Sequence, residues 1–191
     1  FTKEWEGLPA LIRESFLSTF WDPKRGYLAD VVEGTVKDWA VRPNQVIAVS
    51  VEYSPIDPEI KKAVLTVTER ELLTPRGLRT LSPKNESYRG IYKGTQEQRD
   101  MAYHQGTVWP WLLEHFCEGY MNLYKESGIS FLERIIKDFE PVMTELGIGA
   151  IPEIFDGDPP HRARGAISQA WSVAALLRII QRYEKMTQSE S

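Results

Sequence analysis

Side chains that could do chemistry are densest in residues 151–171 (IPEIFDGDPPHRARGAISQAW), where acidic, basic and imidazole groups stand among prolines and glycines. Such a composition favours a loop over a helix. Glu153 lies between Pro152 and an apolar pair, Ile154 and Phe155, that would partly shield its carboxylate. A carboxylate so placed can activate a water molecule as a general base, provided that it stays ionised near neutral pH. The alternative is a glutamate that only caps a helix or braces the loop.

Residues 156–159 (DGDP) follow in the same segment and predict a turn. Asp156 could still accept hydrogen bonds from hydroxyl groups of a ligand. A calcium site is not expected, because the pattern lacks oxygen ligands at alternating positions followed by a distal acid. Cys117 is the only cysteine, so no internal disulfide can form, and no cluster of Cys and His has the spacing of a zinc site. We therefore expect neither a metal nor an organic cofactor.

Two further polar clusters stand beside aromatic residues, in the stretches WAVRPNQ and YHQGTVWPW. Their candidate ligand-binding side chains are Arg42, Asn44, Gln45, His104, Gln105 and Trp109. A flat ring beside hydrogen-bonding groups suits a sugar, which offers an apolar C–H face and a rim of hydroxyls; the alternative is a capped helix whose rings only pack. Arg76 and Arg79, in TPRGLRTLSP, are expected to clamp a loop by donating to backbone carbonyls.

Hydrophobic periodicity predicts helices around these clusters. The six predicted helices cover Pro9–Phe20, Arg42–Val51, Asp57–Leu72, Thr107–Lys125, Ser130–Leu146 and Ala166–Lys185. Asp57 is the expected N-cap of the third helix, and Ser130 with Glu133 forms the expected capping box of the fifth. Pro141 should kink the fifth helix. Residues 74–105 are predicted to form a long functional loop.

These elements predict an all-α fold, in which αα-hairpins lie side by side and the chemistry gathers at one end. Residues 1–186 are expected to form one unit and residues 187–191 a flexible tail. Residues 42–51 are rich in β-branched side chains, so a strand is the alternative there. The side chains that the last helix should direct inward are Ile167, Ala170, Trp171, Ala174, Leu177 and Ile180.

Charge and hydropathy exclude several classes of partner. The formal net charge of -4 and the pI near 5.5 provide no basic field for a phosphate backbone, so nucleic acid is not expected to bind. No apolar run reaches membrane-spanning length, and no charged-then-apolar leader opens the chain, which argues against a membrane partner or a signal peptide. A cytoplasmic location is therefore expected.

Four motifs in order resemble one known family. The segments WAVRPNQ, LLTPRGLRTLSP, YHQGTVWPWL and IPEIFDGDPPHRARGAISQAWSVA look like the C-terminal glucosidase domain (amylo-alpha-1,6-glucosidase) of bacterial and archaeal-type glycogen debranching enzymes. The resemblance covers nearly the whole chain. It implies an (α/α)6 barrel that hydrolyses the α-1,6-linked glucose left at a branch point of glycogen or another branched α-glucan, with inversion at the anomeric carbon.

The resemblance also implies roles for single residues. Glu153 corresponds to the general base of the PEIFDG motif. The implied sugar-binding residues of the RPNQ and YHQG motifs are Arg42, Asn44, Gln45, His104, Gln105 and Trp109, and Asp156 is a further candidate contact.

The general acid of the family has no counterpart in this chain. An inverting glycosidase needs a protonated carboxyl about 6.5–9.5 Å from the base, and in this family it is an aspartate of an upstream Trp-Met-Asp motif. Asp38, beside Trp39, is the nearest imitation. An (α/α)6 barrel also needs twelve helices, and only six are predicted. The chain is therefore expected to be the C-terminal half of the barrel, inactive by itself and a partner of the remaining N-terminal part of the parent enzyme.

A half-barrel should expose apolar helix faces and so tend to self-associate. Two other functions remain open for this sequence. One is a different sugar-active (α/α)6 enzyme, such as a trehalase-like hydrolase or a disaccharide phosphorylase. The other is a helical carbohydrate-binding module without catalytic activity.

Overall fold

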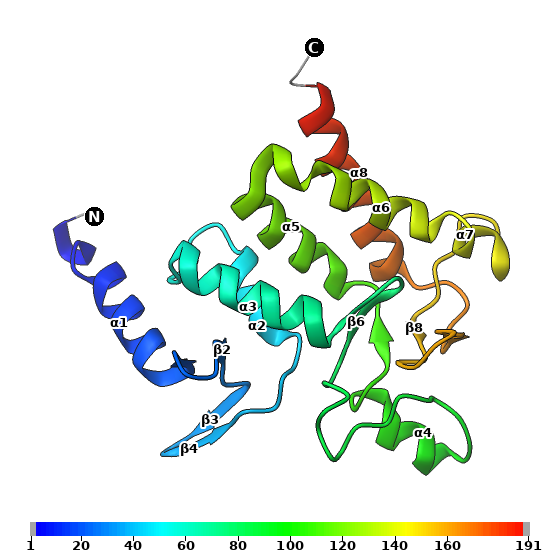
Figure 1. The fold of residues 1–191 in the computed structure, drawn as a ribbon, viewed down its shortest axis with the longest axis horizontal. Coiled ribbons are helices and arrows are strands. Elements are labelled where there is room, and N and C mark those ends of the chain that lie inside the picture. Colours follow the sequence, from blue (N-terminus) through cyan, green and yellow to red (C-terminus); the bar gives the residue numbers. More distant parts are fainter. Residues whose placement is uncertain (1–2, 189–191) are drawn as a thin grey trace.

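The computed structural model describes residues 3–188, and its architecture is mainly helical (Figure 1). The α-helices are α1 (Leu8–Phe20), α2 (Asn44–Ser50), α3 (Pro58–Glu71), α4 (Gln96–Tyr103), α5 (Leu112–Tyr124), α6 (Ile129–Phe139), α7 (Val142–Glu145) and α8 (Ala170–Gln188). Short 3-10 helices, η1 and η2, cover Lys3–Trp5 and Lys125–Gly128. Among these helices, none is long and apolar enough to cross a membrane.

Short strands accompany the helices, so the prediction of an all-α fold is only partly confirmed. Two hairpins pair β1 (Trp21–Asp22) with β2 (Tyr27–Leu28), and β3 (Val31–Glu33) with β4 (Val36–Asp38). A five-stranded antiparallel sheet follows the order β5 (Leu73–Thr74), β6 (Gly77–Arg79), β7 (Val108–Trp109), β8 (Ile154–Phe155) and β9 (Ala163–Arg164). Strands of two or three residues are too short to produce a detectable hydrophobic period.

The five-stranded sheet joins motifs that are far apart in the sequence. Leu78 of β6 lies opposite Trp109 of β7, and Val108 of β7 lies opposite Phe155 of β8. Glu153 directly precedes β8, and the YHQG motif directly precedes the turn into β7. The sheet therefore brings the two motifs with the most polar side chains to the same edge of the helical layer.

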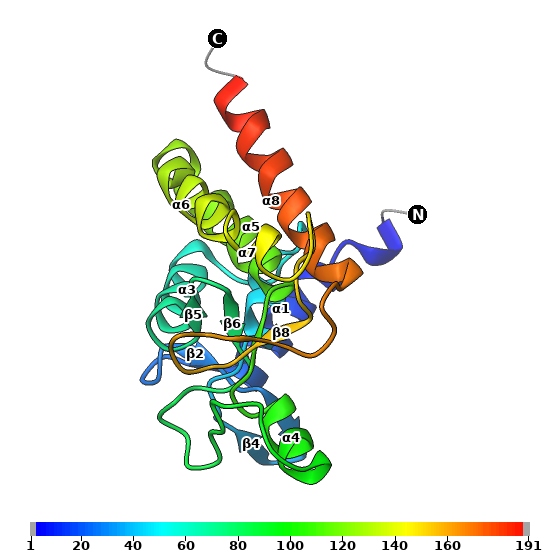
Figure 2. The same cartoon turned by 90° about the vertical axis from the view of Figure 1, so that its right-hand side faces the viewer.

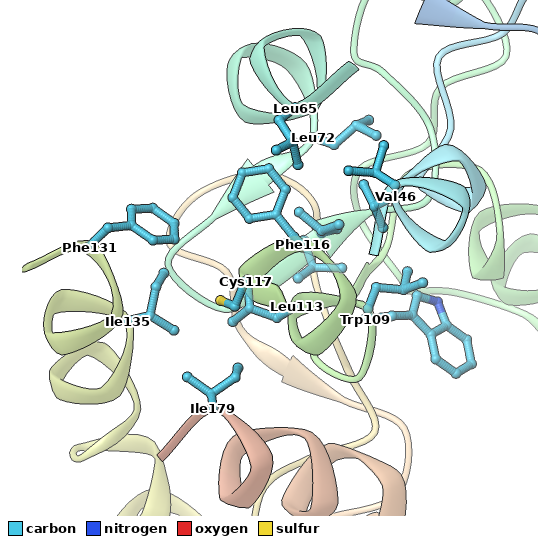
Figure 3. Close-up of a cluster of buried hydrophobic side chains, with 14 of the residues drawn as sticks. Val46, Leu65, Leu72, Trp109, Leu113, Phe116, Cys117, Phe131, Ile135 and Ile179 are labelled. Atoms are coloured by element: carbon cyan, nitrogen blue, oxygen red, sulfur yellow. The ribbon is translucent and has the colours of Figure 1, made fainter. Parts of the chain in front are cut away.

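The hydrophobic core lies between the helices (Figure 3). Helix α5 is central, because it packs against α2, α3 and α8, and α6 packs against α8. Phe116 of α5 is fully buried near Leu65 of α3, while Ile135 and Ile179 close the core on the side of α6 and α8. The indole of Trp109 points away from this cluster at its edge. The core thus anchors the backbone of Trp109, and its ring lies at the edge of the core with only 4% of the residue exposed.

All six predicted helices have counterparts, and the prediction of helix rather than strand over residues 42–51 is confirmed by α2. The boundaries and caps differ in places. Helix α5 begins at Leu112 rather than at Thr107, because β7 and a turn take up the preceding residues. The predicted capping box of Ser130 and Glu133 is wrong: α6 begins at Ile129, and Glu133 pairs instead with Lys137 at 2.8 Å.

The roles predicted for Pro141 and Asp57 also differ from those in the structure. Helix α6 ends at Phe139 and α7 begins after Pro141, so this proline separates two helices instead of kinking one. Asp57 occupies the N-cap position of α3 as predicted, but its side chain makes no cap hydrogen bond. Its carboxylate binds Arg13 and thereby ties α1 to the start of α3.

The predicted loop of residues 74–105 contains regular structure. It holds β6 and the helix α4, whose N-cap residue Thr95 forms a capping box with Gln98. The T-x-x-Q pattern was a local signal for this helix that the hydrophobic period did not support. Helix α4 matters for the site, because it ends at Tyr103 and presents the YHQG motif at its C-terminus.

Helix α8 starts at Ala170 and buries a different face from the one predicted. Ser172, Ala175, Leu176 and Ile179 are buried, whereas Trp171 and Leu177, which were expected inward, are 46% and 54% exposed. The helix projects beyond α5 and α6 in the side view of Figure 2. It also continues through Gln188, two residues into the predicted tail, and residues 189–191 lie outside the described range.

Candidate functional site

A pocket of about 500 Å³ lies where α2, α4, β7 and α8 meet. Its lining residues are Asp30, Arg42, Pro43, Asn44, Thr80, His104, Gln105, Trp109, Trp111, Leu112 and Trp171. Five of the predicted site residues are therefore brought together in one cavity. Its polar groups come mainly from the RPNQ and YHQG motifs, and its apolar surface comes from three indole rings.

Arg42 holds the polar wall of the pocket. Its guanidinium donates to the backbone carbonyls of Thr80 and His104 at 3.0 and 2.7 Å, and to Oε1 of Gln105 at 2.7 Å. Its Nε also lies 3.7 Å from Oδ2 of Asp30. Because these partners come from three separate segments, Arg42 fixes the shape of the wall.

Two residues of the RPNQ motif differ in what they face. Asn44 is exposed at the pocket, where its Nδ2 donates to Oδ1 of Asp30 at 2.8 Å. Gln45 is buried, with Nε2 donating to the carbonyl of Arg42 at 3.0 Å and Oε1 accepting from the amide of Leu28 at 3.4 Å. Gln45 therefore braces the start of α2 and does not line the 500 Å³ pocket.

Aromatic rings also line the pocket. The imidazole of His104 stacks on Trp109 with ring centroids 5.4 Å apart, and Trp111 stacks on Trp171 at 5.8 Å. Trp109 meets Trp171 edge to face at 5.6 Å. Burial and the nearby charge of Arg42 lower the pKa of His104 below its ordinary value, which keeps the ring neutral near pH 7.

Glu153 does not line the 500 Å³ pocket, and Tyr103 connects it to Trp109 of the pocket. Its Oε1 accepts a hydrogen bond from the hydroxyl of Tyr103 at 2.7 Å, and its Oε2 accepts from the amide of Ala166 at 3.1 Å. The ring of Tyr103 packs against Trp109, 4.9 Å away. Burial and the Glu153 carboxylate raise the pKa of Tyr103, so this phenol stays protonated and remains a donor.

Asp156 has a different environment from Glu153. It is 2% exposed, and Arg164 donates to both of its carboxylate oxygens at 2.8–3.1 Å. The amide of Tyr92 donates to it as well, at 2.8 Å. All of these contacts are internal, and Asp156 does not line the 500 Å³ pocket.

The two arginines of the TPRGLRTLSP motif act as the loop clamps that the sequence predicted. Arg76 donates to the carbonyl of Asp138, and Arg79 donates through Nε to the carbonyl of Gly157 at 2.9 Å. Arg79 therefore ties β6 to the loop that follows β8.

Sequence reasoning missed Asp30, Thr80, Trp111 and Trp171 as pocket residues and Tyr103 as the partner of Glu153. Trp171 was assigned to the inward face of the last helix because it follows the helical period. Asp30 had no local signal, since it lies between two hairpins. Only its distance to Arg42 and Asn44 connects it to the site.

The described residues contain no group of three His, Cys, Asp or Glu side chains placed to hold one metal ion. The arrangement therefore offers hydrogen-bonding groups, indole surfaces and one carboxylate held by neutral donors. A mainly helical protein with such a pocket suits a small polyhydroxylated ligand.

Comparisons with known proteins identify the family. The family described as "Amylo-alpha-1,6-glucosidase" matches residues 2–178. The chain belongs to this family, as its motifs indicated. A glycogen debranching enzyme of Saccharomyces cerevisiae is 28% identical over 177 residues, which cover 81% of this chain and 12% of that enzyme. The chain thus spans a small part of the curated relative that it matches.

A solved structure supports the fold. The neutral trehalase Nth1 of Saccharomyces cerevisiae matches 97% of this chain and 32% of its own, with a TM-score of 0.65 and 13% sequence identity. At that identity the match indicates a shared fold.

Proposed function

We propose that this chain forms the C-terminal half of an (α/α)6 catalytic barrel in a glycogen debranching enzyme, which hydrolyses α-1,6-glucosidic bonds at branch points. The family match over residues 2–178 and the yeast relative support this activity. The observation that carries it is the Glu153 carboxylate, which is held by two hydrogen bonds and is linked through Tyr103 to Trp109 of the indole-lined pocket. The trehalase similarity supports the fold and does not favour a trehalase-like substrate.

In the proposed reaction Glu153 is the general base. It accepts a proton from a water molecule whose oxygen attacks the anomeric carbon, while the bond from that carbon to the branch oxygen breaks. A second carboxyl, outside this chain, donates its proton to the departing oxygen. Attack on the face opposite the leaving group inverts the anomeric configuration.

Glu153 is better suited to this role than Asp156. A general base needs a carboxylate oxygen that a water molecule can reach. Asp156 is 2% exposed and both of its carboxylate oxygens accept from Arg164, whereas no salt bridge within residues 3–188 involves Glu153. We propose that Asp156 affects substrate only through the loop that it braces.

The predicted binding residues divide into two roles in this proposal. Asn44, His104, Gln105 and Trp109 line the pocket and would contact the glucose unit. Arg42 and Gln45 would act mainly by holding these groups in place, because their hydrogen bonds go to other parts of the chain.

The test is Glu153→Gln in the whole protein that contains this chain, with glucose release from a branched limit dextrin as the readout. The amide keeps the shape but is a poor proton acceptor, so turnover should fall by about 10²- to 10⁴-fold with little change in KM. The exposed Glu59→Gln substitution in α3 is the matched control and should leave turnover unchanged. Retained turnover of Glu153→Gln would overturn the proposed role.

The 191-residue chain alone should release no glucose, since one carboxylate cannot serve as both acid and base. Appreciable turnover by this chain would contradict the assignment of the acid to another part of the protein.

The proposed half-barrel has apolar side chains for the remaining part of the enzyme to cover. Leu11 and Ile12 of α1 are 62% and 49% exposed, and Leu177 of α8 is 54% exposed. Exposed apolar groups of this kind favour association. The isolated chain should therefore self-associate in sedimentation experiments and bind hydrophobic dyes, and a monomer with low dye binding would contradict this. A cytoplasmic location stays a prediction from the sequence.

A further inference from the structure

We propose that Asp30 is the anchor of the sugar in this pocket, with its Oδ2 accepting a hydrogen bond from a ring hydroxyl of the bound α-glucosyl unit. This inference rests on the proposed function, because it names a recognition group for the same substrate. It adds a residue outside the motifs that identified the family.

The backbone around Asp30 is well fixed. Its amide donates to the carbonyl of Asp38 at 2.9 Å, which ties it to the β3–β4 hairpin. Its side chain is 9% exposed and borders the 500 Å³ pocket. The carboxylate is therefore held at the pocket wall and is mostly withdrawn from bulk solvent.

The two oxygens of Asp30 are used unequally. Oδ1 accepts from Nδ2 of Asn44 at 2.8 Å. Oδ2 accepts no hydrogen bond within the described residues, and the 3.7 Å to Nε of Arg42 is too long for one. A carboxylate can accept about four hydrogen bonds, and one that is withdrawn from solvent needs donors. A ligand hydroxyl meets this need.

The indoles that line the same pocket as Asp30 suit the rest of a sugar ring. Trp111 and Trp171 stack on each other, and Trp171 is 46% exposed despite its size. An indole can cover the C–H face of a pyranose while the hydroxyl rim points to the polar wall. Both neighbours of the Asp30 carboxylate are donors, so they hold this group as an acceptor.

The alternative is that Asp30 has a purely structural role and only holds Asn44 and Arg42 in place. Direct binding of a hydroxyl and this structural role differ in one measurable respect. If Asp30 binds a hydroxyl directly, its substitution should no longer matter for a sugar that lacks this hydroxyl. If Asp30 only shapes the wall, every sugar should be affected by the same factor.

The experiment measures binding of methyl α-D-glucopyranoside and its monodeoxy analogues to the whole protein, by calorimetry and tryptophan fluorescence. Asp30→Asn should weaken binding of the parent glycoside by about 10- to 100-fold, as expected for a lost hydrogen bond to a charged group. At least one monodeoxy analogue should bind the wild type and Asp30→Asn equally weakly. The matched control is Asp22→Asn, because Asp22 binds the amide of Lys24 and pairs with Arg25 and does not line the pocket.

The inference is overturned if Asp30→Asn binds the parent glycoside normally, or if it weakens all analogues by the same factor. Should this variant not fold, the wild type alone decides: equal affinity for the parent and every monodeoxy analogue overturns the inference. A wild type that binds no α-glucoside overturns both this inference and the proposed function. Normal glucoside binding, together with loss of turnover in Glu153→Gln, leaves the proposed function intact whatever the result for Asp30.

Discussion

The pocket wall around Arg42 and the loop that carries Glu153 hold their polar groups in different ways. In the wall, charged groups and amides bind one another, so that Arg42 alone connects Thr80, His104 and Gln105. In the loop, Glu153 is held by one phenol and one backbone amide, both neutral. The first arrangement fixes the shape of the wall, and the second holds the Glu153 carboxylate without a charged partner among the described residues. Binding and proton transfer should therefore respond to different substitutions.

Beyond substitution of Glu153 itself, the largest expected effect on the Glu153 side is that of Gly165→Ala. Gly165 has φ +66°, and an added Cβ would lie 2.3 Å from Oε2 of Glu153, so the carboxylate must move. A displacement of about 1 Å costs roughly 100-fold in rate, and kcat of the whole protein should fall by this order while binding of methyl α-glucoside is kept. Gly149→Ala is the matched control, since Gly149 has φ +71° with nothing within 4 Å of the added atom. Equal turnover in the two variants would remove the distinction between the two regions.

The corresponding test of the wall is Arg42→Lys. A lysine keeps the charge but cannot supply the forked donors, so the carbonyls of Thr80 and His104 lose their partners. The free energy of unfolding should fall by about 2 kcal/mol, as measured by urea denaturation, and sugar affinity should fall with it. Arg25→Lys, at a more exposed ion pair with Asp22, should change stability by less than about 0.5 kcal/mol. A stable Arg42→Lys protein with normal affinity would contradict the role of the wall.

A smaller effect is expected for Tyr103→Phe, which removes one hydrogen bond to Glu153 and keeps the ring against Trp109. Turnover should fall by about tenfold with KM unchanged, which is the rate equivalent of one hydrogen bond. Tyr92→Phe is the control, because its ring lies 5.8 Å from Tyr103 and its hydroxyl makes no hydrogen bond among the described residues. A rise in KM without a change in kcat would place Tyr103 with the wall instead.

The smallest effect concerns pH. Burial and Arg42 lower the pKa of His104, so its neutral form is favoured in the folded state. The stability that this provides is present above the unfolded value of about 6.5 and is lost as the pH falls through the lowered folded value. Urea denaturation at pH 7 and pH 5 should show a smaller acid-induced loss in His104→Gln than in the wild type. The same loss in both proteins would contradict this prediction.

Much of the helical framework was predictable, and the failures have a common cause. Helices α1 and α3 follow from local apolar periods and end signals, whereas the period of residues 42–51 left a strand as the alternative to α2. Helix α8 was placed correctly, but its buried face was not, because a helix with apolar residues on several sides does not specify which side its neighbours cover. The sheet escaped prediction because Val108 and Phe155 pair across 46 intervening residues and leave no local pattern.

The sequence by itself determined the family, through the order of four motifs, and it determined which segments are rich in polar groups. It could not decide which of those groups meet. Glu153 and Asp156 lie three residues apart, on either side of β8, yet one binds neutral donors and the other an arginine. Asp30 joins the pocket from outside every motif. Only the tertiary structure decides such roles, because burial and pairing depend on contacts between segments that are distant in the chain.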